Sequence, residues 1–97
     1  LTLPYVPSWT EPIWHIFIIR HPHRDELQAK LQRAGVGTLI HYPVPPHLSE
    51  AYADAGFRRG DFPITEELAN TMLSIPMGPH MQPEDVEYVI STIQSVV

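Results

Sequence analysis

The pattern of apolar and polar positions divides the first forty residues into a strand, a helix and a second strand. Residues 13–20 are rich in β-branched and aromatic side chains, which predicts a strand. Apolar side chains recur at helical spacing within 24–34, which predicts a helix that ends at Gly35. The apolar run 36–40 then predicts a second, shorter strand.

The second half of the chain continues the alternation of helices and strands. The predicted elements are a short helix over 48–55, a loop over 57–63, a helix over 64–71, a strand over 72–76 and a last helix that begins near Pro83. The last helix has an apolar stripe that consists of Val86, Val89, Ile90, Ile93 and Val97.

This order of elements predicts an α+β fold, in which helices pack on one face of a small three-stranded sheet. Residues 1–12 contain three prolines and no periodic pattern, so we expect an extended N-terminal segment followed by a single domain over 13–97. The strand at 13–20 is apolar on both faces except at His15, and both faces should therefore be covered. A domain of 97 residues has few helices and can cover both faces of a sheet only with difficulty. Together with the start at Leu1, this indicates a piece of a longer protein from which a neighbouring domain is missing.

Composition excludes several classes of function. The net charge is −5, with six Lys and Arg against eleven Asp and Glu, so the chain is a poor candidate for binding nucleic acid or an anionic membrane. No apolar run approaches the roughly 18 residues that a membrane span needs. There is no cysteine, which excludes disulfides and thiolate chemistry and is compatible with a reducing compartment, so we expect a cytoplasmic protein.

The candidate functional stretch is the segment 41–47, His-Tyr-Pro-Val-Pro-Pro-His. Its prolines fix the backbone after two adjacent polar rings, His41 and Tyr42, and a rigid loop of this kind can present both rings to a ligand. On spacing alone the simpler interpretation is favoured, which is a proline-rich surface loop with a packed tyrosine. His47 lies at the end of the same segment, but the sequence gives no reason to assign it a functional role.

Other chemistry-bearing residues fit structural roles better than catalytic ones. The six histidines show neither the spacing nor the Cys or carboxylate support of a zinc site, so we expect no native metal. Glu66 and Glu67 lie in a predicted first helical turn, where acidic residues are expected for dipole reasons. Asp61 is expected to order its loop with Arg58 or Arg59. His15 is either a satisfied core residue or a polar group that faces a missing neighbour.

Four runs stand in the same order and spacing as in a known enzyme family. These runs are 14–20 (WHIFIIR), 35–43 (GVGTLIHYP), 61–63 (DFP) and 73–77 (LSIPM). Together they resemble the C-terminal small domain of the DegT/DnrJ/EryC1/StrS sugar aminotransferases, and the resemblance covers essentially the whole chain. These enzymes use pyridoxal 5′-phosphate (PLP) and have the aspartate aminotransferase fold type. The resemblance implies transfer of an amino group from an amino acid, commonly glutamate, to a keto-sugar nucleotide, most closely a dTDP-linked one.

The resemblance also implies that the PLP-binding residues lie in a larger N-terminal domain of the same chain. A Schiff-base enzyme needs a lysine in a pocket, and the one lysine here, Lys30, lies on the polar side of a predicted helix. We therefore expect no catalytic and no cofactor-binding residue in this chain. Under the resemblance, His41 and Tyr42 line the nucleotide-sugar pocket, and the full-length enzyme is a homodimer.

Two other classes of function remain open. The chain could be a free-standing α+β module that binds a small ligand through 41–47 and has no catalytic activity. A metal-dependent hydrolase would require stoichiometric metal in the purified protein, which we expect to be absent.

Overall fold

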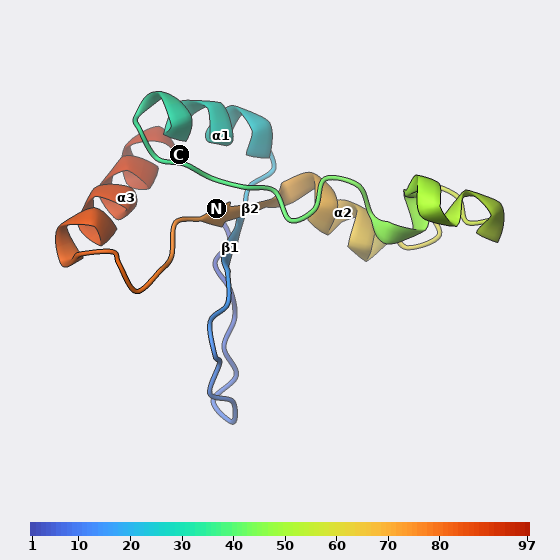
Figure 1. Cartoon of the computed structure of the whole chain (residues 1–97), viewed down its shortest axis with the longest axis horizontal. Helices are drawn as coiled ribbons and strands as arrows, with labels where there is room; N and C mark the ends of the chain where they lie inside the picture. The colour runs from blue at the N-terminus through green and yellow to red at the C-terminus, as the bar shows by residue number, and fades with distance from the viewer.

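A computed structural model describes all 97 residues and shows an elongated α+β arrangement (Figure 1). The elements in chain order are β1 (Phe17–Arg20), α1 (Arg24–Arg33), the 3₁₀ turns η1 (Pro46–Leu48) and η2 (Glu50–Ala55), α2 (Pro63–Thr71), β2 (Met72–Ile75) and α3 (Pro83–Val96). The three longer helices and the strand at 72–75 confirm the sequence predictions. The helix expected over 48–55 is wrong in type, because this segment forms 3₁₀ turns.

The sheet has two strands, β1 and β2, which pair antiparallel with Phe17 opposite Ile75 and Arg20 opposite Met72. The strand predicted over 36–40, and with it the predicted three-stranded sheet, is wrong, since only Leu39 of this run pairs, in an isolated bridge with Ser74. Its two backbone hydrogen bonds, of 2.8 and 3.1 Å, still place this segment beside β2. A similar isolated bridge joins Thr2 to Arg20 along the other edge.

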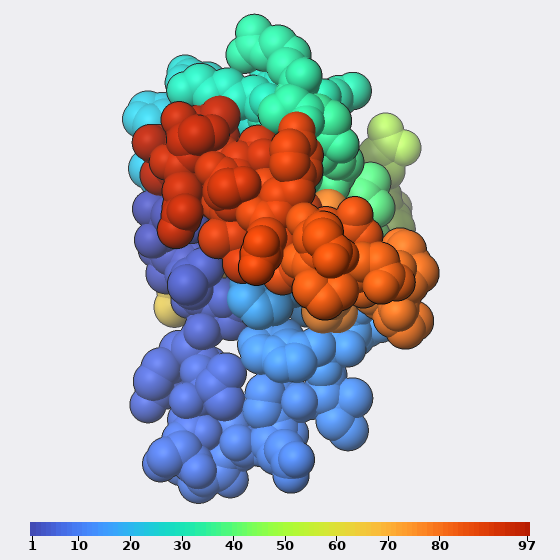
Figure 2. All heavy atoms as spheres, turned by 90° about the vertical axis from the view of Figure 1, so that its left-hand side faces the viewer, coloured from blue at the N-terminus to red at the C-terminus, as the bar shows by residue number.

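The core lies between one face of this sheet and the helices α1 and α3. Ile19 of β1 and Leu73 of β2 are almost completely buried there, against side chains of both helices and of the segment after α1. The helical and connecting members of this core are Leu27, Leu31, Val36, Val89 and Ile93. Figure 2 shows α3, in red, packed against α1, in blue-green. This arrangement confirms that helices cover one face of the sheet.

The opposite face of the sheet stays open within these 97 residues. Ile16 and Ile18 lie there with Leu68 and Met72, and they line a groove of about 450 Å³. The strand expected from residue 13 is also shorter than predicted, because pairing begins only at Phe17. Between Thr2 and β1 the chain forms an arm that extends away from the sheet and returns to it (Figure 1), and Ile13 in this arm is 96% exposed. The chain itself therefore does not supply the two-sided cover that the apolar pattern predicts.

Helix α1 ends in the way its sequence predicts. Gly35 has a φ of +81°, and the N–H groups of Gly35 and Val36 donate to the carbonyls of Gln32 and Leu31. These two bonds are the Schellman arrangement, and it directs Val36 into the core next to Leu31. The hydroxyl of Tyr88 on α3 donates to the carbonyl of Ala34 at 2.6 Å, so the end of α1 is also tied to α3.

Replacing Gly35 by alanine is expected to destabilise the fold by about 1 kcal/mol, because a side chain at positive φ is strained. No atom lies within 4 Å of the position that the new methyl group would occupy, so the cost comes from the backbone alone. Urea unfolding of the purified chain measures it. The matched control is Gly37→Ala, which is equally unobstructed but has no positive φ. Equal stability of the two variants would contradict the prediction.

Helix α3 begins with Pro83 and is capped by Asp85, whose carboxylate accepts the N–H of Gln82 at 2.9 Å. The predicted apolar stripe is partly buried: Val89 and Ile93 enter the core, whereas Val86 and Ile90 remain about half exposed. None of the helices is long and apolar enough to cross a membrane.

Candidate functional site

His41 lies where the segment after α1 leaves the edge of β2, and its ring is fixed from β2. Its Nδ1 atom is 2.8 Å from the hydroxyl oxygen of Ser74. The backbone bridge between Leu39 and Ser74 holds the chain two residues earlier. A buried strand residue thus fixes both the backbone and the ring of a half-buried histidine.

Tyr42 is 73% exposed, and its ring meets the His41 ring edge to face with centroids 5.5 Å apart. The two rings lie beside a hollow of about 280 Å³ that Pro45, Thr65 and Leu68 also line. The simpler interpretation of this loop, with a packed tyrosine, is therefore wrong for Tyr42. His41 also lines a second hollow, of about 200 Å³, so it stands between two spaces that a ligand could enter.

The second hollow contains several polar side chains. His15, Thr38, His41 and Ser74 line it together with Met77. His15 is exposed, which rules out the interpretation of this residue as a satisfied core histidine. Imidazole and hydroxyl groups around a small open space can hydrogen-bond to hydroxyl or phosphate oxygens.

The far end of the 41–47 loop is held by a cluster that the sequence did not reveal, which we call the Glu66 cluster. The carboxylate of Glu66 accepts the N–H of Gly60 at 2.8 and 2.9 Å and that of Phe62 at 3.3 Å. His47 Nε2 lies 3.4 Å from Glu66 Oε2 without forming a hydrogen bond, and its ring packs edge to face on Phe57 and Phe62. One buried carboxylate therefore joins α2, the loop before it and the end of the 41–47 loop, which we call the His-Tyr loop.

These contacts correct the sequence interpretation of the two glutamates. Glu67 forms a 3.1 Å ion pair with Arg20, as a surface residue can. Glu66 is structural, but its role is to bind backbone N–H groups of the preceding loop rather than only to face the helix dipole. A glutamate one turn after an apolar N-cap was the available signal, since a side chain there can reach back to the N–H groups of that turn.

The contacts of Glu66 lower the pKa of its carboxyl below the ordinary value of 4.5. The main cause is the Gly60 N–H, while the Phe62 N–H and His47 add smaller effects in the same direction and burial opposes them. Because the folded pKa lies below the unfolded one, ionised Glu66 stabilises the fold at neutral pH.

The stabilisation by Glu66 should be complete above about pH 4.5 and should be lost as pH falls through the lowered pKa. Acid titration of stability, by urea midpoints from pH 3 to 7, measures this for the wild type and for Glu66→Gln. We expect a constant difference between the two at neutral pH that shrinks in acid. A matched control is Glu67→Gln on the exposed side of α2, and a difference that persists unchanged at pH 3 would contradict the assignment.

The remaining candidate residues show no catalytic grouping. Asp61 orders its loop as expected, since its carboxylate accepts the N–H of Arg58 at 2.8 Å. His21 lies close to His23 in the turn before α1 and accepts that residue's N–H. No three His, Asp or Glu side chains are grouped closely enough to hold a metal ion.

The one lysine of this chain is not placed to hold PLP as a Schiff base. Lys30 is its one lysine, and its Nζ lies on the exposed side of α1, 3.5 Å from the carbonyl of Val96 near the end of α3. A Schiff-base lysine needs a pocket that holds the cofactor's aldehyde, and Lys30 lines none of the five main hollows of this surface.

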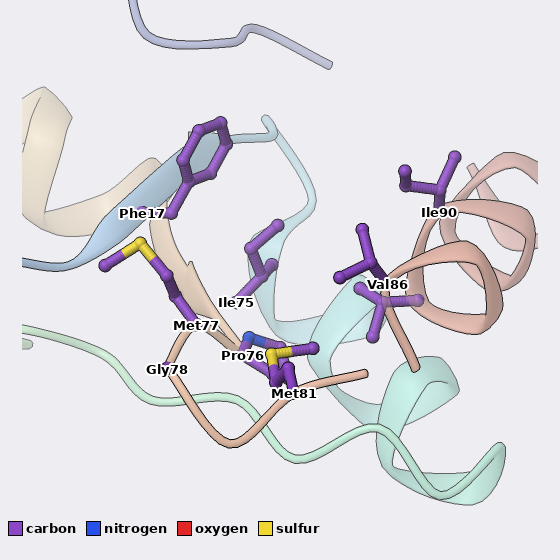
Figure 3. Close-up of a pocket in the computed structure, with 9 residues that line it drawn as sticks. Phe17, Ile75, Pro76, Met77, Gly78, Met81, Val86 and Ile90 are labelled. Carbon is purple, nitrogen blue, oxygen red and sulfur yellow. The ribbon is translucent and has the colours of Figure 1, made fainter. Parts of the chain in front are cut away.

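Another apolar hollow, of about 330 Å³, lies between β2 and α3 (Figure 3). Phe17, Ile75 and Met77 line one side and Val86 and Ile90 of α3 the other, with Pro76 and Met81 below. None of its lining residues has a titratable side chain, so it can bind apolar groups but offers no acid, base or nucleophile.

Known proteins match this chain over nearly its whole length, although the chain spans only about a quarter of theirs. It is 50% identical over 95 residues to the erythromycin biosynthesis sensory transduction protein EryC1 of Saccharopolyspora erythraea, covering 98% of this chain and 26% of that protein. It is 42% identical over 92 residues to the dTDP-3-amino-3,4,6-trideoxy-α-D-glucose transaminase of Streptomyces venezuelae, covering 95% and 24%. Among solved structures, S. venezuelae DesV superposes with a TM-score of 0.93 at 41% identity, covering 97% and 25%. A model of the DegT/DnrJ/EryC1/StrS aminotransferases matches residues 2–94, and the chain therefore belongs to this aminotransferase family.

Proposed function

We propose that these 97 residues are the C-terminal domain of a PLP-dependent aminotransferase that transfers an amino group, with glutamate as donor, to a keto-sugar nucleotide. The observation that supports this most strongly is the family match over residues 2–94, together with relatives of which it covers about a quarter. The domain is inactive alone, because Lys30 is not placed to bind PLP. PLP supplies the electron sink for transamination when bound, and the rest of the enzyme provides its lysine.

In this proposal the His-Tyr loop is the substrate-binding part of the domain. His41 hydrogen-bonds to hydroxyl or phosphate oxygens of the nucleotide sugar, and the exposed ring of Tyr42 packs on the hexose. The Ser74 contact at one end of the loop and the Glu66 cluster at the other hold it in place, which lowers the entropy lost when a ligand binds.

The surface also supports a larger assembly. The open sheet face around Ile18 and Met72 and the exposed apolar arm are surfaces that isolated proteins rarely leave uncovered. We assign these surfaces to contacts with the PLP-binding domain of the same enzyme, which acts as a cytoplasmic homodimer.

The proposal is tested by replacing His41 and Tyr42 in the full-length enzyme. His41→Ala and Tyr42→Ala should each raise the KM for the sugar nucleotide about five- to thirtyfold, because each removes a contact worth about 1–2 kcal/mol. Bound PLP, measured by its absorbance, should change little, since neither residue holds the cofactor. The assay uses dTDP-3-amino-3,4,6-trideoxy-α-D-glucose as amino donor to 2-oxoglutarate, the reverse of synthesis.

The controls separate this function from a free-standing binding module. Tyr52→Ala removes an exposed aromatic ring outside both hollows and should leave the kinetics unchanged. The isolated 97-residue chain should show neither PLP absorbance nor transamination. Wild-type sugar kinetics in both single variants would contradict the loop assignment, and transamination by the isolated chain would contradict the domain assignment.

A further inference from the structure

We propose that Ser74 is a positioning residue for His41. Its hydroxyl donates to Nδ1, which fixes the imidazole as the Nε2–H tautomer and leaves Nε2–H to donate to an oxygen of the nucleotide sugar. This inference rests on the proposed function. It adds the residue that makes His41 a hydrogen-bond donor, rather than an acceptor, toward the substrate.

The position of Ser74 in the sheet is unusual for a serine. Its strand is otherwise apolar, and Ser74 lies opposite Ile18 while remaining only 7% exposed. Burying a hydroxyl is unfavourable unless it is hydrogen-bonded, and the 2.8 Å contact with His41 Nδ1 provides that bond. The sequence showed this serine in the run Leu73-Ser74-Ile75-Pro76, but its role appears only when His41 is placed beside it.

The backbone around Ser74 adds rigidity to this contact. The Ser74 N–H donates to the Leu39 carbonyl at 2.8 Å, and the Leu39 N–H donates to the Ser74 carbonyl at 3.1 Å. Ser74 therefore holds the chain two residues before His41 and the His41 ring at the same time. A histidine held at both points cannot rotate freely to expose Nδ1 to a ligand.

The direction of the hydrogen bond follows from the available partners. The Ser74 hydroxyl contacts no other acceptor, so a buried O–H would lose its bond if Nδ1–H were the donor. Donation from Ser74 Oγ to Nδ1 satisfies the hydroxyl, and in the neutral ring it places the proton on Nε2. The histidine then offers the ligand a donor, which matches an acceptor oxygen of a hexose hydroxyl, a keto group or a diphosphate.

Four variants of the full-length enzyme test this assignment, again with dTDP-3-amino-3,4,6-trideoxy-α-D-glucose and 2-oxoglutarate. Ser74→Ala should raise the KM for the sugar nucleotide about tenfold, while kcat and the KM for 2-oxoglutarate stay within about twofold. Ser74→Thr retains the hydroxyl on a β-branched side chain that suits a strand, and should restore the KM to within about threefold. In the His41→Ala background, Ser74→Ala should have no further effect, because a positioning residue acts only through its partner.

Two more measurements separate a failure of this inference from a failure of the proposed function. Thr92→Val removes another buried hydroxyl, 8% exposed and away from both hollows, and should behave as the wild type. NMR of enzyme labelled with ¹⁵N-histidine reads the tautomer of His41 directly, without turnover: we expect Nε2–H in the wild type and a mixture in Ser74→Ala.

The outcomes are distinct. A wild-type KM in Ser74→Ala, an additive loss in the His41→Ala background, or an Nδ1–H tautomer in the wild-type enzyme would each overturn the positioning role. If the wild-type enzyme does not use the sugar nucleotide at all, the proposed function fails, and the tautomer measurement still decides the assignment of Ser74.

Discussion

Leu73→Ala is expected to destabilise the purified 97-residue chain more than any other substitution considered for it, by about 3–5 kcal/mol. Leu73 is 0% exposed in the centre of β2 and lies in the small cluster that joins the sheet to α1 and α3. Truncating a fully buried leucine costs about 3–5 kcal/mol, which includes the cavity that it leaves. A domain of this size has a total stability of only about 5–10 kcal/mol, so about half of it would be lost.

Far-UV circular dichroism during urea unfolding measures this loss. Leu39→Ala is the matched control: it removes the same side chain from the neighbouring segment, but Leu39 is 64% exposed, and the expected change is within about 0.5 kcal/mol. Leu73→Met keeps the volume and should cost less than about 1.5 kcal/mol. A Leu73→Ala variant as stable as Leu39→Ala would show that the core is not where the structure places it.

The helices were predictable because their signals are local. The termination of α1 depends on Gly35 and on groups within four residues of it, and α3 begins with Pro83 and the nearby carboxylate of Asp85. A helix satisfies its own backbone, so spacing and capping residues within one segment are enough to place it.

The strands were less predictable because each needs a partner distant in the sequence. The run 36–40 has the composition of a strand, but only Leu39 pairs with β2, so the strand predicted there reduces to a single bridge. In the same way, the apolar pattern from residue 13 shows which side chains avoid water but not that pairing with β2 begins at Phe17. The sequence alone contains no measure of where two strands meet.

In the candidate site, too, residues with local signals were predictable and residues with distant partners were not. His41 and Tyr42 are adjacent and were identified from the loop and its family resemblance, whereas Ser74 is 33 positions from His41. Glu66 lies beside His47, from the far end of the 41–47 loop. Glu66 becomes a buried hydrogen-bond acceptor only because the loop before α2 folds back over its carboxylate. Residues that orient the site were hidden because their partners are brought together only by the fold.

Arg24 is the clearest example of a residue whose role depends on distant partners. The sequence places it as the first polar residue of α1, yet it is only 8% exposed. Its guanidinium donates to the carbonyls of Ala69 and Met72 at 3.0 and 2.9 Å, and it also pairs with Asp25. Since α2 passes directly into β2 at Met72, these bonds hold the junction of the two elements to the start of α1.

Arg24→Ala is therefore expected to destabilise the chain by about 2–3 kcal/mol, because it leaves two carbonyls at the junction without their donor and removes a buried aliphatic stem. Arg33→Ala, in the last turn of the same helix and exposed, is the control and should change stability by less than about 0.5 kcal/mol.

The same substitution should also affect the full-length enzyme. Ala69 and Met72 line the hollow beside His41 and Tyr42, so the Arg24→Ala enzyme should show a raised KM for the sugar nucleotide. Arg24→Lys should recover only part of both losses, because an ammonium group lacks the planar fork that reaches two carbonyls. Urea unfolding of the chain and sugar-nucleotide kinetics of the enzyme measure the two effects, and equal stabilities of Arg24→Ala and Arg33→Ala would refute the role of Arg24 at this junction.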